Sequence, residues 1–194
     1  MSGAGEVLEN PISGQRIIIR RTARETGGEF LEVESVYTKP VVHRPPDHYH
    51  PYQEERFEVL SGTLRVGVGG EELELREGDV LVVPPGTTHE MSSETAGTRV
   101  NWKTYPAMDT EGFFRIIWGL AADGKTNRKG TPNLLQMAVI ARRYRNEFRL
   151  ARPSRLVQDL IFGALAPIGR LVGYRDHYPG HARGEVSERV EVGQ

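Results

Sequence analysis

Short apolar stretches alternate with polar residues through the first half of the chain. Over Phe30–Thr38 the apolar residues occupy alternate positions, which is typical of a strand with one buried face. Similar stretches recur as far as Tyr105, with glycine or proline turns between them. This pattern predicts a mainly β fold, an antiparallel barrel or double-sheet jelly roll over residues 16–106. Residues 1–15 are predicted to form a flexible N-terminal arm.

After Pro106 the apolar residues recur every three or four positions, which predicts helices. The expected helices cover residues 113–122, 134–148 and 155–174. We expect residues 107–174 to form a helical extension that acts as a lid or a dimer contact. A flexible tail over residues 175–194 is expected to follow, because that stretch is rich in glycine, histidine and charge.

Two of these helices could pack against a partner. The first would carry an apolar face that a homodimer could bury. That face consists of Phe113, Phe114, Ile117 and Trp118. The third helix is also fairly apolar, but charged residues and Pro167 interrupt it, so it lacks a clean apolar span. Packing against the barrel or a second subunit explains this helix better than membrane contact does.

The composition argues against several classes of function. The formal net charge is −1, which gives no electrostatic case for binding nucleic acid or an anionic membrane. There is no cysteine, so a metal would have to be held by nitrogen and oxygen ligands. Residues 1–11 lack the basic start and apolar core of a signal peptide, and we therefore expect a cytoplasmic location.

Three histidines and a carboxylate form the candidate functional cluster. His48 and His50 are two residues apart, so they would share one face of a strand. Glu55 follows beyond a turn, and His89 lies on a later hairpin. Such a set can hold one divalent metal ion (Fe, Mn, Ni, Co, Cu or Zn) and leave a coordination position open for a reactant. Glu54 is the alternative carboxylate.

The choice between the two neighbouring glutamates depends on strand parity. Glu55 shares its face with Phe57 and Val59, which should point into the barrel, whereas Glu54 should face away. We therefore predict Glu55 as the ligand.

This part of the chain resembles the two sequence motifs of the cupin family. The matching residues are His48, His50, Glu55 and Gly62 in the first motif and Gly78, Pro84, Gly86 and His89 in the second. Val42 and Ser93 stand where the family often has glycine and asparagine, so loop shape and outer hydrogen bonds are in doubt there. The resemblance covers roughly residues 29–105.

The resemblance implies a small jelly-roll barrel with the metal at its centre. It assigns metal ligation to His48, His50, Glu55 and His89, and it implies that homodimers are common. It does not imply one reaction, because proteins of this fold include enzymes of several classes, regulators and storage proteins.

Three functions are compatible with such a site. The first is a metal-dependent enzyme that oxidises or cleaves a small organic molecule with oxygen, as a dioxygenase does, with Glu55 able to accept a proton. The second is a metal-dependent isomerase or lyase without redox chemistry. The third is a barrel that binds a small molecule without turnover.

Other residues of the cluster's surroundings are harder to assign. Four residues are candidates for contact with the substrate, although core packing explains each equally well. They are Tyr37, Phe57, Met91 and Trp102. Three further histidines, His43, His177 and His181, fall in a predicted loop or in the tail and are not expected to be ligands.

Overall fold

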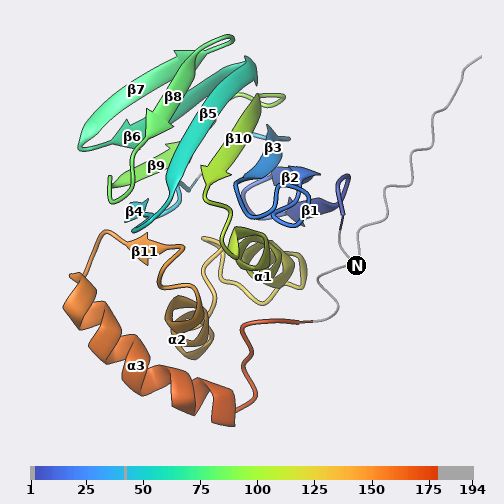
Figure 1. The fold of residues 1–194 in the computed structure, drawn as a ribbon. Coiled ribbons are helices and arrows are strands. Elements are labelled where there is room, and N and C mark those ends of the chain that lie inside the picture. Colours follow the sequence, from blue (N-terminus) through green and yellow to red (C-terminus); the bar gives the residue numbers. More distant parts are fainter. Residues whose placement is uncertain (1–2, 42, 179–194) are drawn as a thin grey trace, which may run out of the picture.

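The computed structural model describes residues 3–41 and 43–178. Within these residues, two antiparallel sheets are followed by three helices (Figure 1). One sheet has the strand order β1 (Val7–Asn10), β2 (Gln15–Arg21), β3 (Leu31–Tyr37), β10 (Arg99–Tyr105), β5 (Glu54–Ser61) and β8 (Val80–Val83). The other has the order β11 (Arg149–Leu150), β4 (His48–Tyr49), β9 (His89–Ser92), β6 (Thr63–Val68) and β7 (Glu71–Arg76). The predicted jelly-roll fold is confirmed.

The core lies between the two sheets and follows the alternation of the sequence. Every second residue of β3, from Leu31 to Tyr37, is buried. The same holds for β5, where Phe57 and Val59 are fully enclosed. The turn after β5 requires glycine, because Gly62 has a φ of +79° and an added Cβ would lie 2.5 Å from the Thr98 hydroxyl. Local pattern and tertiary packing therefore agree in the barrel.

The start of the chain differs from the predicted flexible arm. Residues Val7–Asn10 form β1, which pairs antiparallel with β2 and buries Leu8. Just before it, Glu6 forms an ion pair of 2.8 Å with Arg115 of the first helix. The apolar signal of this strand is only two residues long, which is too short to separate from a loop in the sequence.

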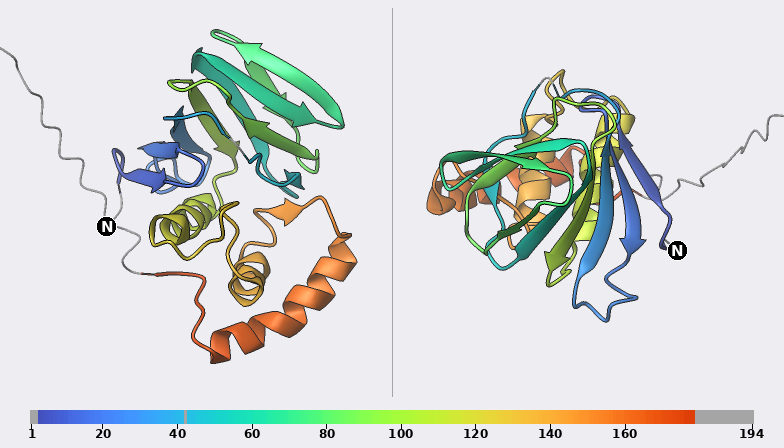
Figure 2. Two further views of the ribbon diagram at one scale, coloured as in Figure 1. Left: turned by 180° about the vertical axis from the view of Figure 1, so that it is seen from behind. Right: turned by 90° about the horizontal axis from the view of Figure 1, so that it is seen from above.

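The helices gather at one end of the barrel, beside β4 and β11 (Figure 2). They are α1 (Thr110–Ala122), α2 (Leu134–Arg143) and α3 (Arg155–Leu171). The second helix ends earlier than predicted because the chain turns back to form β11. The third runs through Pro167 instead of stopping there. None of the described helices is both long enough and apolar enough to span a membrane.

The apolar face of α1 packs inside the chain, which corrects its predicted use in a dimer. Phe114 and Trp118 are buried, and the ring of Phe114 lies 4.9 Å from the ring of Trp102 in the barrel. Phe113 and Ile117 pack partly against the same core. A fold that places this helix on the end of the barrel leaves no large face on it for a partner.

The first residues of the predicted tail are held against α2. The Gln136 side chain donates to the carbonyl of Arg175 (2.7 Å) and accepts from the Tyr178 hydroxyl (2.8 Å). Flexibility is therefore not seen at residues 175–178, and residues 179–194 lie outside the described part of the chain.

Candidate metal centre

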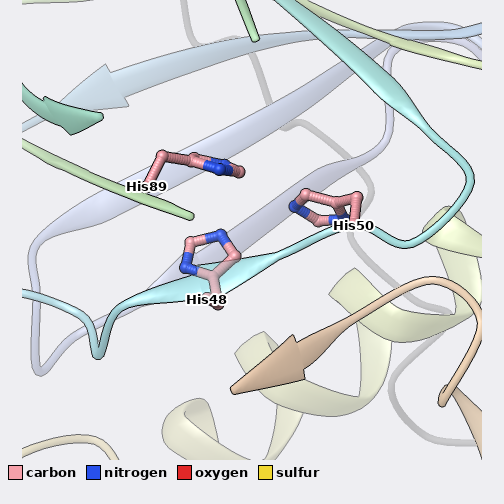
Figure 3. Close-up of side chains that lie close together, drawn as sticks. All are labelled: His48, His50 and His89. Atoms are coloured by element: carbon pink, nitrogen blue, oxygen red, sulfur yellow. The ribbon is translucent and has the colours of Figure 1, made fainter. Parts of the chain in front are cut away.

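Three imidazoles meet at the end of the barrel that faces the helices. His48 lies in β4, His50 follows that strand directly, and His89 opens β9. The two strands pair at His48 and His89, which brings sequence-distant residues side by side. One nitrogen of each ring lies within 4.8 Å of the others (Figure 3). Among the described residues this group is the one that could hold a metal ion.

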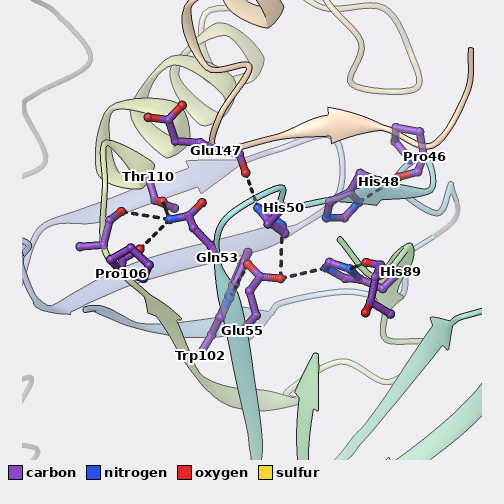
Figure 4. A network of polar contacts seen from close by, with 12 residues as sticks. Pro46, His48, His50, Gln53, Glu55, His89, Trp102, Pro106, Thr110 and Glu147 are labelled. Atoms are coloured by element: carbon purple, nitrogen blue, oxygen red, sulfur yellow. Dashed lines mark hydrogen bonds and ion pairs between the residues drawn. The ribbon is translucent and has the colours of Figure 1, made fainter. Parts of the chain in front are cut away.

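Each imidazole is oriented by a hydrogen bond from Nδ1 to a backbone carbonyl (Figure 4). The acceptors are Pro46 for His48 (3.0 Å), Glu147 for His50 (2.5 Å) and Thr87 for His89 (3.0 Å). A ring that donates through Nδ1 presents the lone pair of Nε2, which is how metal-binding histidines are usually held. The Nε2 atom of His50 is buried and makes no hydrogen bond to any of the described residues.

Glu55 lies beside the imidazoles on the facing sheet. Its Oε2 atom is 2.8 Å from Nε2 of His89 and 3.3 Å from Nε2 of His50. Its Oε1 atom accepts a hydrogen bond of 3.1 Å from the indole nitrogen of Trp102. The side chain is buried, whereas Glu54 is partly exposed on the other face of β5. The prediction from strand parity therefore identified Glu55, the carboxylate that points at the histidines.

The charges of this cluster are strongly coupled. Burial alone would raise the pKa of Glu55, but His50 and His89 outweigh it, and the pKa falls to about 2. Burial, helped by His89 and His50, lowers the pKa of His48 to about 3. Burial also acts to lower the pKa of His89, but the hydrogen bond and charge of Glu55 prevail and raise it. At neutral pH the cluster thus holds an ionised carboxylate and a neutral His48.

The helical extension supplies a wall of the cluster, formed by residues that the sequence did not identify. The ring of Phe148 stacks on His48 at 4.8 Å and on Phe113 at 4.9 Å. Next to it, Leu150 of β11 pairs with His48 of β4, and the carbonyl of Glu147 accepts from His50. An isolated phenylalanine after a helix carries no recognisable signal, and a carbonyl acceptor carries none at all, so neither could be found from the sequence.

The predicted substrate contacts lie at different depths of the barrel. Trp102 touches Glu55 directly, and Phe57 lies 6.4 Å from His89 and 5.5 Å from Trp102 between ring centres. Met91 is a buried core residue two positions along β9 from His89.

Tyr37 is too far away for the role predicted for it. The register of β3, β10 and β5 sets Leu31 level with Glu55 through Thr104. Tyr37 is six residues further along β3, or about 20 Å at the rise of a strand. It is therefore a core residue at the opposite end of the barrel. The loop histidine His43 and the tail histidine His177 are exposed and stand outside the cluster, and His181 lies outside the described residues.

Residues 36–102 match the family model of the cupin domain. The chain carries a cupin domain. Its barrel, its two motifs and its histidine cluster agree with that assignment, and the match includes the four predicted ligands. It does not include Glu147 and Phe148, which belong to the extension.

Two curated relatives of the cupin domain are enzymes by name. Quercetin 2,3-dioxygenase of Bacillus subtilis (strain 168) is 33% identical over 116 residues, which are 60% of this chain and 33% of that protein. The probable oxidoreductase yanE of Aspergillus niger is 37% identical over 68 residues, 34% of this chain and 26% of that protein. The chain thus spans about a third or less of the length of these relatives.

Two solved structures are similar to about half of this chain. An RmlC-like cupin from Shewanella frigidimarina NCIMB 400 is 22% identical, with a TM-score of 0.47, over 55% of this chain and 88% of that one. KdgF from Halomonas sp. is 20% identical, with a TM-score of 0.45, over 50% of this chain and 84% of that one.

The donors present fit a divalent metal ion. Three imidazole nitrogen donors and one buried carboxylate are a common ligand set for first-row metals. Nε2 of buried His50 makes no hydrogen bond within the described part of the chain, which leaves its lone pair available to a metal ion. The ligand types do not select one metal among Fe, Mn, Ni, Co, Cu and Zn.

Proposed function

We propose that this protein is a metal-dependent enzyme that uses oxygen to oxidise or cleave a small organic molecule, as a dioxygenase does. The observation that carries the proposal is the convergence of three Nδ1-anchored imidazoles beside the carboxylate of Glu55. The similarity to a protein named quercetin 2,3-dioxygenase supports the oxidative form of the chemistry. The metal would be held by His48, His50 and His89, with Glu55 as a further ligand.

A divalent metal in this position would supply Lewis acidity and, if it is redox-active, electron transfer to oxygen. Side chains of the protein would supply the other roles, namely accepting a proton and orienting the carboxylate. Glu55 is ionised at neutral pH, but its low pKa makes it a weak base, so it could accept a proton only from a hydroxyl group that a bound metal has made strongly acidic. The indole of Trp102 fixes the other oxygen of the same carboxylate and so directs Oε2 towards the histidines.

Access to the cluster is restricted to one side. His50, Glu55 and His89 are buried, whereas His48 and Phe148 are only partly covered. A substrate would therefore approach past Phe148, whose ring shields His48. Such a cover would keep water away from a reactive intermediate, which an oxygen-dependent reaction needs.

Metal analysis followed by oxygen uptake tests this proposal. The purified protein is assayed for metal content, stripped, and reloaded separately with each of the six candidate metals. Oxygen consumption is then measured with a panel of flavonols, other phenols, enols and hydroxy acids. We expect uptake with a redox-active metal, and we expect His50→Ala to lose both the metal and the uptake because His50 offers an unpartnered nitrogen.

Glu54→Gln is the matched control, because it changes a carboxylate that faces away from the cluster. It should keep metal content and oxygen uptake. Turnover of the panel with zinc and without oxygen uptake would instead support an isomerase or lyase. If the protein turns over no compound with any metal, but a compound of the panel raises its melting temperature, the protein binds a small molecule without catalysis.

A further inference from the structure

The outer face of α3 is apolar and exposed within residues 3–41 and 43–178. Six large apolar residues of this helix are between 40% and 87% exposed. They are Leu156, Val157, Leu160, Ile161, Ile168 and Leu171. In Figure 1 the helix lies at the edge of the molecule, with α2 between it and the barrel. A contiguous apolar face of this kind on a folded domain marks an interaction site.

The geometry of the helix separates this face cleanly from the charges. At 100° per residue, the six side chains fall within an arc of about 140° around the helix axis. Within Arg155–Leu171, the charged residues Arg155, Asp159 and Arg170 fall outside that arc. The opposite side, with Gln158, Ala166 and Gly169, is buried. The helix is thus enclosed on one side and apolar on the other.

We propose that this face is a homodimer interface in which α3 packs antiparallel against α3 of a second copy. The exposed fractions of the six residues correspond to roughly 700 Å² per chain, close to the about 800 Å² that each partner contributes to a standard interface. A two-fold axis through the middle of the helix would set Leu156 and Leu160 against the partner subunit's Leu171 and Ile168.

Ala164 supports a close helix crossing. At 100° per residue it falls near the centre of the arc of the six apolar side chains, and it is exposed. It lies near the middle of α3, where two antiparallel helices would approach most closely, and its small side chain lets the two backbones come together.

The charges that flank the face favour a protein partner over a lipid surface. Asp159 pairs with Arg149 at 2.8 Å, and Arg170 pairs with Asp176 at 3.0 Å. These flanking charges are already neutralised within the chain, whereas helices that bind membranes carry a row of free basic side chains beside the apolar face. The proposal does not depend on the chemistry at the metal centre.

Sedimentation velocity of the full chain at about 10 µM, a concentration that detects micromolar association, tests the interface. We expect a dimer for the wild type and a monomer for Leu160→Glu, with association weakened by about 100-fold. Val82→Glu is the control, since Val82 is also an exposed apolar residue (45%, against 75% for Leu160) but lies on β8, far from α3. It should stay dimeric.

Ala164→Gln separates the interface from folding. Ala164 is exposed and glutamine is a good helix former, so circular dichroism should show an intact fold. Its dimer should nevertheless be weaker, because the longer polar side chain stands at the centre of the helix crossing. A monomeric wild type, or a dimer broken by Val82→Glu and not by Leu160→Glu, would overturn the proposal. Leu160-dependent binding of a monomer to phosphatidylcholine–phosphatidylserine vesicles would assign the face to lipid and overturn it too.

Discussion

Replacing Trp102 by phenylalanine tests how the carboxylate of the metal centre is held. The indole nitrogen donates to Oε1 of Glu55 at 3.1 Å, and both side chains are buried. Phenylalanine removes this donor. It keeps an aromatic ring between Phe57 and Phe114, whose ring centres lie 5.5 Å and 4.9 Å from that of Trp102. The substitution therefore removes one hydrogen bond and a limited volume.

The size of the effect follows from the two losses. A hydrogen bond to a charged group contributes about 1.5–3 kcal/mol to the free energy of unfolding. The smaller ring leaves a cavity that costs about 1 kcal/mol more. We therefore expect the metal-free protein to lose about 2.5–4 kcal/mol of stability at neutral pH. A residue that orients a ligand from behind typically changes metal affinity by about 10–100-fold, and we expect a loss in that range.

The same substitution at the other tryptophan of the chain provides the control. The indole nitrogen of Trp118 is buried but has no hydrogen-bond partner among the described residues. Trp118→Phe should therefore cost only the cavity, about 1 kcal/mol, and leave metal affinity unchanged. Urea denaturation and competitive metal titration measure both quantities. If Trp102→Phe is no more harmful than Trp118→Phe in either assay, the indole does not hold Glu55.

Three further predictions concern the covering ring, the proton of the cluster and the N-terminal sheet. Phe148→Ala should lower the free energy of unfolding, measured by urea denaturation, by about 2–3 kcal/mol, because two stacked ring contacts are lost. The control Tyr52→Ala, at an exposed aromatic residue, should lower it by less than about 0.5 kcal/mol. Burial acts to lower the pKa of His89, but Glu55 raises it, so metal binding should release a proton at pH 6 and release less as the pH rises through that pKa. Calorimetry in buffers of different ionisation enthalpy would detect this change. Equal proton release at every pH would contradict the role of His89 as a metal ligand. Glu34→Gln should cost about 1.5–3 kcal/mol, since this buried carboxylate accepts hydrogen bonds from two arginines. Burial opposes the effect of those arginines, but they lower the pKa of Glu34, so its stabilisation is present above the ordinary pKa of about 4.5 and is lost as the pH falls below it.

The face on which a residue lies could be predicted, because strand parity is local. Residues that are two positions apart lie on the same face of a strand, independently of the tertiary structure. Parity placed His48 and His50 together and chose Glu55 over Glu54, and the structure agrees with it in each case. The cupin motifs added the distant His89, whose position depends on strand pairing that no local pattern contains.

The level of a residue along the barrel could not be predicted, because it depends on register between strands. Tyr37 has the right parity, yet the pairing of β3 with β10 puts it at the far end from Glu55. The same limit applies to the helices. An apolar stripe predicts that α1 is covered, but not whether the barrel or a second copy covers it.

One residue connects the metal centre to the proposed dimer face. The buried guanidinium of Arg149, in β11, pairs with Asp159 of α3 at 2.8 Å and donates to the carbonyl of Arg145 at 2.8 Å. The chain between Arg145 and Arg149 includes the carbonyl that orients His50 and the ring that covers His48. A dimer that fixes α3 would therefore also restrain the wall of the metal centre. This wall lies outside residues 36–102, which match the cupin domain.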